Sequence, residues 1–160
     1  MTDDATNTSA SQTKIYLDVC CLQRPFDDQR HTRIRLEAEA VKLILVRIEN
    51  GECLWVSSEV VDDEIAQNPD VERALKAKLL VTHATLKISI TEHEIARAVE
   101  LEQLGFAGFD ALHLACAERG DIHLFLTTDD KLLKRANRLA TQLRVRVVNP
   151  LQWLQEVEAK

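Results

Sequence analysis

Short apolar runs alternate along this chain with segments whose apolar residues recur every three or four positions. In one such segment, Ile34, Ala38, Val41, Leu45 and Ile48 are spaced as on one face of a helix. The runs predict buried strands, and the periodic segments predict helices. We expect strands at residues 14–19, 53–57, 86–90, 123–128 and 144–148, and helices at about residues 34–50, 58–68, 71–83, 91–104, 108–120, 129–140 and 149–157.

The alternation of strands and helices predicts the fold class. It favours an α/β fold with a mainly parallel sheet and helices on both faces, which is a Rossmann-like three-layer sandwich. A capping box at Thr91 to Glu94 and a proline at position 150 mark two helix starts. The first 13 residues, MTDDATNTSASQT, are polar. We therefore expect a disordered tail over residues 1–13 and a single domain over residues 14–160.

Composition adds expectations about location and cysteine chemistry. The chain is 46% hydrophobic and 29% charged, and no apolar run approaches the roughly 20 residues that cross a bilayer. The N-terminal residues lack the basic start and apolar stretch of a secretory signal, so we expect a cytoplasmic protein without a membrane partner. None of the four cysteines forms a C-x-x-C pair, so a disulfide framework or structural zinc site is disfavoured.

The net charge of −6 counts against a broad basic surface for duplex nucleic acid. Basic residues nevertheless gather locally, and four of them are candidates for contact with RNA phosphates. Solvated or ion-paired side chains are an equally open interpretation of the same residues. These candidates are Arg24, Lys134, Arg135 and Arg138.

Four acidic residues are the candidates for catalysis. Asp18 and Asp129 follow predicted strands, Glu64 shares the inward face of its helix, and Asp110 lies in a first helical turn. Any one of them could serve only its helix, because a helix N-terminus favours negative charge by about 0.3–1 kcal/mol. In an open parallel sheet, however, these positions face one crevice. Converging carboxylates repel each other unless a cation lies between them, and Mg²⁺ and Mn²⁺ prefer oxygen ligands.

The order and spacing of these segments resemble the PIN domain, the metal-dependent nuclease fold of VapC-type toxins and RNA-processing enzymes. The resemblance covers nearly everything after the predicted tail. An Asp-Ala-Leu start to an apolar helix and a strand followed by Thr-x-Asp are its most specific parts. The segments that carry it are IYLDVCCLQRPFDD, SSEVVDDEI, GFDALHLACAE, LFLTTDDKLL and VVNPLQWL.

The resemblance implies an endoribonuclease that hydrolyses phosphodiester bonds of single-stranded RNA with one or two Mg²⁺ or Mn²⁺ ions. It implies that Asp18, Glu64, Asp110 and Asp129 are the metal ligands and catalytic residues. It further implies that Thr127 orients a carboxylate or a water. Many PIN domains are homodimers, and the toxin members are held inactive by an antitoxin, so both partners are expected.

Two alternatives remain open at this point. The family usually has Asn where this chain has Cys20, which strand alternation would place on the same side as Asp18. Because a thiol is a weak hydrogen-bond donor, a catalytically weakened PIN-fold domain that binds proteins is the alternative function. His113 lies one turn after Asp110. We interpret it as a histidine bonded to a neighbouring group, with approach to the metal site as the alternative.

Overall fold

The computed structural model describes residues 12–159. Nearly all of the tail predicted for residues 1–13 lies outside the described residues, and the first strand begins at Thr13. Five strands form one sheet in the order β3-β2-β1-β4-β5, and all four pairings are parallel. This arrangement confirms the predicted α/β class. The strands are β1 (Thr13–Leu17), β2 (Cys53–Ser58), β3 (Leu86–Ile88), β4 (Leu124–Leu126) and β5 (Arg146–Val148).

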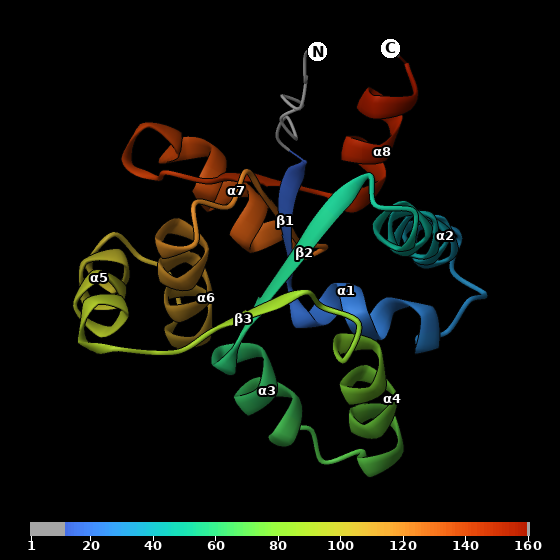
Figure 1. The fold of residues 1–160 in the computed structure, drawn as a ribbon, viewed down its shortest axis with the longest axis horizontal. Coiled ribbons are helices and arrows are strands. Elements are labelled where there is room, and N and C mark those ends of the chain that lie inside the picture. The colour runs from blue at the N-terminus through green and yellow to red at the C-terminus, as the bar shows by residue number, and fades with distance from the viewer. Residues whose placement is uncertain (1–11, 160) are drawn as a thin grey trace, which may run out of the picture.

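Helices lie on both faces of the sheet, as the alternating pattern predicts. In Figure 1, α5 and α6 lie on one side of the strands and α2 and α8 on the other, and each pair packs together. The helices are α1 (Val19–Gln23), α2 (Thr32–Glu49), α3 (Glu59–Ala66), α4 (Val71–Val81), α5 (Glu92–Gln103), α6 (Gly108–Arg119), α7 (Asp130–Arg138) and α8 (Pro150–Glu158), with short 3₁₀ turns at Arg24–Phe26 and Ala140–Gln142. The fold is therefore the three-layer sandwich expected from the sequence.

The first strand is shorter than predicted, because a helix begins immediately after it. β1 ends at Leu17, and α1 starts at Val19 with the Asp18 side chain accepting a hydrogen bond from the Val19 backbone N–H at 2.9 Å. Val19, which ended the predicted strand, is instead the first residue of this helix, and its side chain is buried. The strand-alternation argument for Cys20 was therefore wrong, since Cys20 belongs to α1. Its side chain still lies next to Asp18, because Cys20 is in the first turn of the helix that Asp18 caps.

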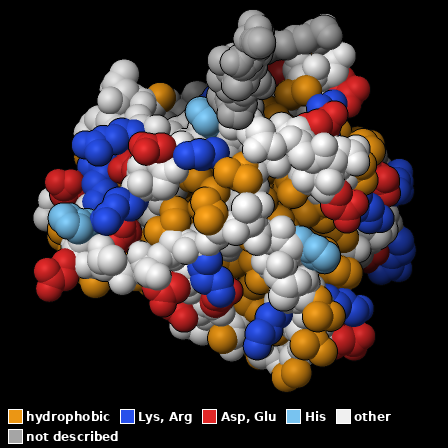
Figure 2. Space-filling view, viewed as in Figure 1, with side chains coloured by type: hydrophobic (Ala, Val, Ile, Leu, Met, Phe, Trp, Pro, Cys, Tyr) orange, Lys and Arg blue, Asp and Glu red, His pale blue; other side chains and the backbone are white. Residues whose placement is uncertain are grey.

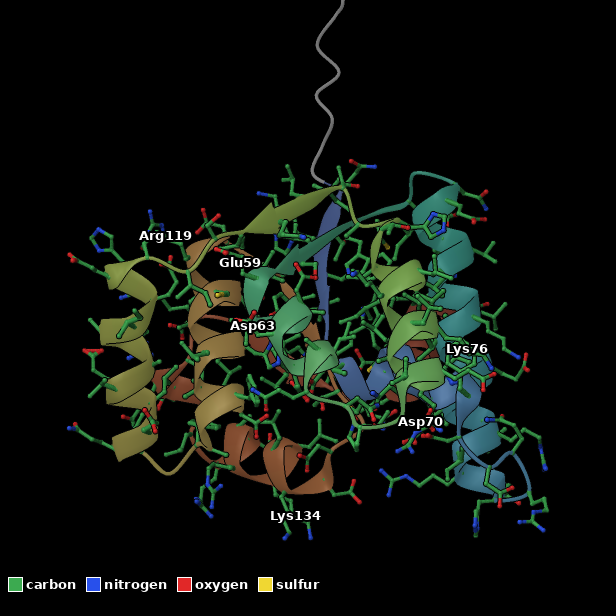
Figure 3. All side chains as sticks on the ribbon, turned by 90° about the horizontal axis from the view of Figure 1, so that it is seen from below. Glu59, Asp63, Asp70, Lys76, Arg119 and Lys134 are labelled. Carbon is green, nitrogen blue, oxygen red and sulfur yellow. The ribbon has the colours of Figure 1, made fainter. Side chains whose placement is uncertain are left out.

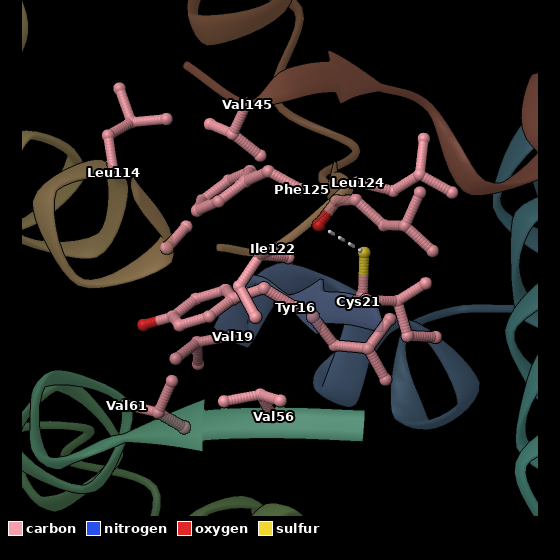
Figure 4. Close-up of a cluster of buried hydrophobic side chains, with 14 of the residues drawn as sticks. Tyr16, Val19, Cys21, Val56, Val61, Leu114, Ile122, Leu124, Phe125 and Val145 are labelled. Atoms are coloured by element: carbon pink, nitrogen blue, oxygen red, sulfur yellow. Dashed lines mark hydrogen bonds between the residues drawn. The ribbon is translucent and has the colours of Figure 1, made fainter. Parts of the chain in front are cut away.

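The core lies between the sheet and the two helical layers. Tyr16 of β1 stacks on Phe125 of β4 with ring centroids 5.1 Å apart, and both side chains are fully buried. Figure 4 shows this pair beside Cys21, whose thiol donates to the Leu126 carbonyl at 3.3 Å. The four cysteines are free thiols. Burial of apolar surface, rather than disulfide bonds, thus holds the described residues together.

The outer face of α4 is apolar. Val71, Leu75 and Leu79 are spaced four residues apart on this helix and are 77%, 55% and 60% exposed. Hydrophobic side chains are correspondingly grouped over α4 in the lower part of Figure 2. We refer to these three residues as the α4 stripe. Among the described residues, no helix combines the length and apolar character needed to cross a membrane.

Candidate active site

The candidate site lies where the strand order reverses. From β1 the chain builds β2 and β3 on one side, and then returns to place β4 and β5 on the other. The carboxyl ends of β1 and β4 are neighbours, because Leu17 is in register with Leu126. The residues that leave these two strands are Asp18 and the segment Thr127 to Asp129. Such a switch point is where open parallel sheets bind ligands.

Asp18 is buried and held by hydrogen bonds on both carboxylate oxygens. Its Oδ1 accepts from the Val19 backbone N–H at 2.9 Å, and its Oδ2 accepts from the Thr127 hydroxyl at 2.7 Å. The Cys20 thiol also lies 3.4 Å from Oδ2. Burial raises the pKa of Asp18, while the positive field of His113 and the bond from Thr127 lower it, and the net shift is upward. A bound cation would relieve this unfavourable burial of charge.

Thr127 links two of the predicted acids. Its hydroxyl donates to Asp18 and accepts from the Asp129 backbone N–H at 3.1 Å. Cys20 joins the same cluster, with its Sγ 3.3 Å from the Thr127 hydroxyl and accepting from the Thr128 backbone N–H at 3.3 Å. The structure therefore brings both predicted supporting residues, Thr127 and Cys20, against the first acid.

Asp129 and Asp110 each begin a helix. Asp129 caps α7, with its Oδ1 accepting from the backbone N–H groups of Lys131 and Leu132 at 2.9 and 3.3 Å. Asp110 lies in the first turn of α6, and within residues 12–159 its carboxylate has no hydrogen-bond partner. Burial and then repulsion from Asp18 and Asp129 raise the pKa of Asp110 to about 7. Asp18 and Asp129 are thus close enough to Asp110 for their charges to act on it.

Glu64 reaches the same cluster from α3 through a histidine. His113 Nε2 lies 2.7 Å from Glu64 Oε1 and 3.9 Å from Asp18 Oδ1, and the side chain of His113 is fully buried. Donor atoms of Asp18, Glu64 and His113 all lie within 4.8 Å of one another. Burial lowers the pKa of His113, but the bond to Glu64 and the charge of Asp18 outweigh it and raise the pKa overall.

His113 is the residue that the sequence-based site omitted. Its interpretation as a histidine bonded to a neighbouring group is accurate, and that neighbour is a predicted site acid. The available signal was its position one helical turn after Asp110, which places both on adjacent surface of α6. No local pattern indicates its second partner, the hydroxyl of Tyr16, 2.6 Å from Nδ1 and 97 residues away in the sequence.

The four predicted RNA-contacting residues have different surroundings. Lys134 and Arg138 are exposed on α7 and form no ion pair within the described part of the chain, and Figure 3 shows Lys134 at the outer edge of the molecule. Arg24 is instead ion-paired with Asp27 at 2.9 Å and with Glu37 at 3.0 Å. Arg135 is partly buried on the side of α7. Lys134 and Arg138 can thus meet a phosphate without breaking an ion pair, whereas Arg24 cannot.

The donor set fits a hard divalent cation. Asp18 and Glu64 offer carboxylate oxygens within 4.8 Å of each other, and Asp110, whose carboxylate has no hydrogen bond within residues 12–159, is repelled by Asp18 and Asp129. Oxygen-rich sites of this kind suit Mg²⁺ and Mn²⁺. Asp18, Asp110 and Asp129, with Glu64, are the residues that would hold the ion.

Metal binding is expected to strengthen as the pH rises from 6 to 8. Because the pKa of Asp110 is raised to about 7, its carboxyl is protonated below that pH and must lose the proton to bind a cation. The affinity for Mn²⁺ should therefore fall by up to about tenfold for each pH unit below 7. Calorimetric titration at pH 6, 7 and 8, in two buffers of different ionisation enthalpy, measures both the affinity and the released proton. An affinity that is flat over this range contradicts the assignment of Asp110.

Comparison with known proteins gives a family and a fold. The family model of the PIN domain matches residues 15–139. A structure of VapBC2 from Rickettsia felis, bound to a DNA fragment from their promoter, is similar with a TM-score of 0.54 and 12% identity, over 86% of this chain and 98% of that chain. A structure of VapBC-1 from nontypeable Haemophilus influenzae has a TM-score of 0.53 and 14% identity, over the same shares. No curated protein matches the sequence significantly.

Proposed function

The chain belongs to the PIN domain family, and on that premise we propose that residues 14–160 form one domain that acts as a Mg²⁺- or Mn²⁺-dependent endoribonuclease. The reaction would be hydrolysis of phosphodiester bonds in single-stranded RNA. The observation that carries the proposal is the meeting of Asp18 and Glu64, with carboxylate oxygens within 4.8 Å of each other, beside Asp110, whose pKa is raised to about 7 by burial and by repulsion from Asp18 and Asp129. Repulsion between these carboxylates destabilises the folded protein when no cation is bound, and the same carboxylates can hold a catalytic cation.

The acids and their supports have separate roles in this proposal. Asp18, Asp110 and Asp129 hold one or two ions, and Glu64 is a further ligand, either directly or through water. When bound, the ion supplies an activated water and offsets the negative charge of the phosphodiester. Thr127 keeps Asp18 and the backbone of Asp129 in fixed relation through its two hydrogen bonds. Preorganised ligands of this kind lose little entropy when the ion and the substrate bind.

The exposed bases of α7 are suited to guide the RNA strand. Lys134 and Arg138 lie on the helix that Asp129 caps, so a strand whose phosphate reaches the acids passes near them. With a net charge of −6, binding would rest on such local contacts rather than on the field of the whole protein. Arg24 would contribute only after leaving its ion pairs with Asp27 and Glu37, and Arg135 from its partly buried position on α7.

We further propose that the protein is a toxin that pairs with an antitoxin protein, acts in the cytoplasm and forms a homodimer. The support is that the two similar structures described above are of VapBC complexes. The α4 stripe offers apolar surface of the kind that partner proteins cover. The alternative function is a catalytically weakened PIN-fold module that binds proteins. The α4 stripe and the presence of Cys20 in place of Asn support it.

A cleavage assay separates these two functions. End-labelled single-stranded RNA is incubated with the protein and Mn²⁺, Mg²⁺ or EDTA, beside Asp18→Asn and the matched control Asp63→Asn, an exposed acid of α3 (Figure 3). We expect cleavage with metal only, lost in Asp18→Asn and retained in Asp63→Asn. Equal cleavage by all three proteins would rule out this site. No cleavage by any of them, together with tight binding of a partner protein, would favour the binding module.

A further inference from the structure

A buried chain of hydrogen bonds runs from β2 to Glu64. The Ser58 hydroxyl lies 2.6 Å from the Tyr16 hydroxyl, and that hydroxyl lies 2.6 Å from His113 Nδ1. His113 Nε2 then lies 2.7 Å from Glu64 Oε1. Ser58, Tyr16 and His113 are at most 1% exposed, whereas the Glu64 side chain is 33% exposed. These hydrogen bonds thus connect the buried interior to an acid whose side chain is one-third exposed.

The imidazole of His113 is a hydrogen-bond donor to Glu64. An ionised carboxylate has only acceptor atoms, so the hydrogen between them belongs to Nε2. This holds for the neutral ring and for the protonated ring alike. A nitrogen that carries a hydrogen has no lone pair for a metal, and Nδ1 is engaged by Tyr16. Although His113 lies close to Asp18 and Glu64, neither of its ring nitrogens is therefore available as a third metal ligand.

In the neutral ring, every hydrogen along the chain points toward Glu64. Nδ1 then accepts from the Tyr16 hydroxyl, and the Tyr16 oxygen accepts from the Ser58 hydroxyl. The Ser58 oxygen in turn accepts from the backbone N–H groups of Val60 and Val61 at 3.1 and 3.4 Å. Each buried polar group of the chain has a partner, as stable interiors require.

Aromatic packing also restrains the imidazole of His113. The Tyr16 ring is stacked on Phe125, and His113 meets the Phe125 ring with centroids 6.3 Å apart and the Tyr16 ring with centroids 5.6 Å apart. Glu64, by contrast, has a flexible side chain on the short helix α3. Ordering such a side chain costs up to about 1.5–2 kcal/mol of conformational entropy. A rigid donor reduces that cost before the metal arrives.

We propose that His113, itself oriented by Tyr16 and Ser58, is a positioning residue that holds Glu64 ready for the metal and is not a metal ligand. This inference rests on the proposed function, because it assigns Glu64 to the same metal site. Partners that orient metal ligands typically account for 10- to 100-fold in metal affinity. The chain would then set how tightly the site binds its ion.

A double-mutant cycle on Mn²⁺ affinity tests the proposal without using RNA. Calorimetry on metal-stripped protein compares His113→Gln and Tyr16→Phe, each alone and combined with Glu64→Gln. Tyr16→Phe removes only a hydroxyl and keeps the ring stacked on Phe125. We expect His113→Gln to weaken Mn²⁺ binding about 10- to 100-fold and Tyr16→Phe about 2- to 10-fold. Both effects should shrink to less than about twofold in the Glu64→Gln background.

Two serines of β2 supply a matched control. Ser58→Ala removes the start of the chain, whereas the buried hydroxyl of Ser57 has no hydrogen-bond partner within the described residues. Ser57→Ala should leave Mn²⁺ affinity unchanged, while Ser58→Ala lowers it. Ser58 also caps α3, so Ser58→Ala could be too unstable to measure. In that case the Tyr16→Phe result alone tests the role of the hydrogen-bond chain.

The outcomes separate this inference from the proposed nuclease activity. The same loss of affinity for His113→Gln with and without Glu64→Gln would overturn the positioning role, since the histidine would then act as a ligand or through the general fold. A wild-type protein that binds Mn²⁺ and shows the expected coupling, yet cleaves no RNA, would refute the nuclease and support the positioning role. A wild-type protein that binds no Mn²⁺ would overturn both.

Discussion

Replacement of Asp110 with Asn is expected to abolish RNA cleavage and, in the absence of metal, to make the protein more stable. The activity loss should be at least about 10²- to 10³-fold, because the proposed metal site would lose one of the charges that hold its ion. Asn has nearly the same shape as Asp, and the Asp110 carboxylate has no hydrogen bond within residues 12–159 to lose. The substitution therefore isolates the effect of the charge.

The gain in stability follows from the raised pKa. The pKa of Asp110 is about 7 in the folded protein, against an ordinary value of 3.8. The folded state therefore binds this proton more tightly than the unfolded state, so metal-free stability falls as the pH rises from 4 to 7. Asn removes that penalty. At pH 8 we expect a gain of roughly 1–2 kcal/mol, reduced from the full shift because Asp110 is partly exposed to water.

Urea unfolding in EDTA at pH 5 and pH 8 measures this effect. The difference between Asp110→Asn and the wild type should be larger at pH 8 than at pH 5. Saturating Mn²⁺ should reverse the order, because it stabilises only the folded form that binds it. The exposed acid control, Asp63→Asn, should match the wild type in both assays. A variant that cleaves RNA normally, or is less stable than the wild type at pH 8 in EDTA, would remove Asp110 from the site.

Replacement of Glu37 with Gln is expected to be the most destabilising change of a single charge. Glu37 of α2 is 1% exposed, and it lies 3.0 Å from Nε of Arg24 and 3.0 Å from Nε of Arg33. The Asn149 side chain also donates to it at 2.7 Å. Removing the Glu37 charge takes one carboxylate partner from each of Arg24 and Arg33, which keep Asp27 and Asp130, and the loss at a buried network should cost about 3 kcal/mol. Arg33 also binds Asp130 at 2.7 Å, so the network reaches the residue next to Asp129.

The matched control for Glu37 is two residues along the same helix. Within the part of the chain that the structure describes, Glu39 pairs with Lys42 alone, at 3.4 Å, and both side chains are more than half exposed. Glu39→Gln should change the free energy of unfolding by no more than about 0.5 kcal/mol. Urea unfolding of the two variants at pH 7 compares them directly. If Glu37→Gln unfolded at the same urea concentration as Glu39→Gln, the buried network would contribute nothing to stability.

The regular part of the fold follows from the hydrophobic pattern. The spacing of Ile34 to Ile48 predicts the helix observed at Thr32–Glu49, and the capping box at Thr91 and Glu94 is present as predicted. Strand ends also predict where carboxylates meet, because parallel strands place their carboxyl ends at one edge. That is why Asp18 and Asp129 could be paired from sequence although 111 residues separate them (129 − 18).

The remaining features depend on contacts that leave no local pattern. α1 is only five residues long, and its apolar residues continue those of β1, so periodicity could not separate the helix from the strand. Glu37 is an acid on a long amphipathic helix, and its burial depends on Arg24 and on Asn149, which lies 112 residues away. The bond between His113 and Glu64 joins α6 to α3. Only the folded chain brings such partners together.

The central position of β1 also sets when the site can exist during synthesis. Ile15 pairs with Leu124, which is made 109 residues later (124 − 15). A ribosome that adds about 5–20 residues per second takes on the order of ten seconds to cover that distance. Until then, the growing chain carries Asp18 and Glu64 with no β4 to complete the sheet. The proposed site, which takes Asp18 from the end of β1 and Asp129 from the segment after β4, therefore cannot be complete until β4 has been translated.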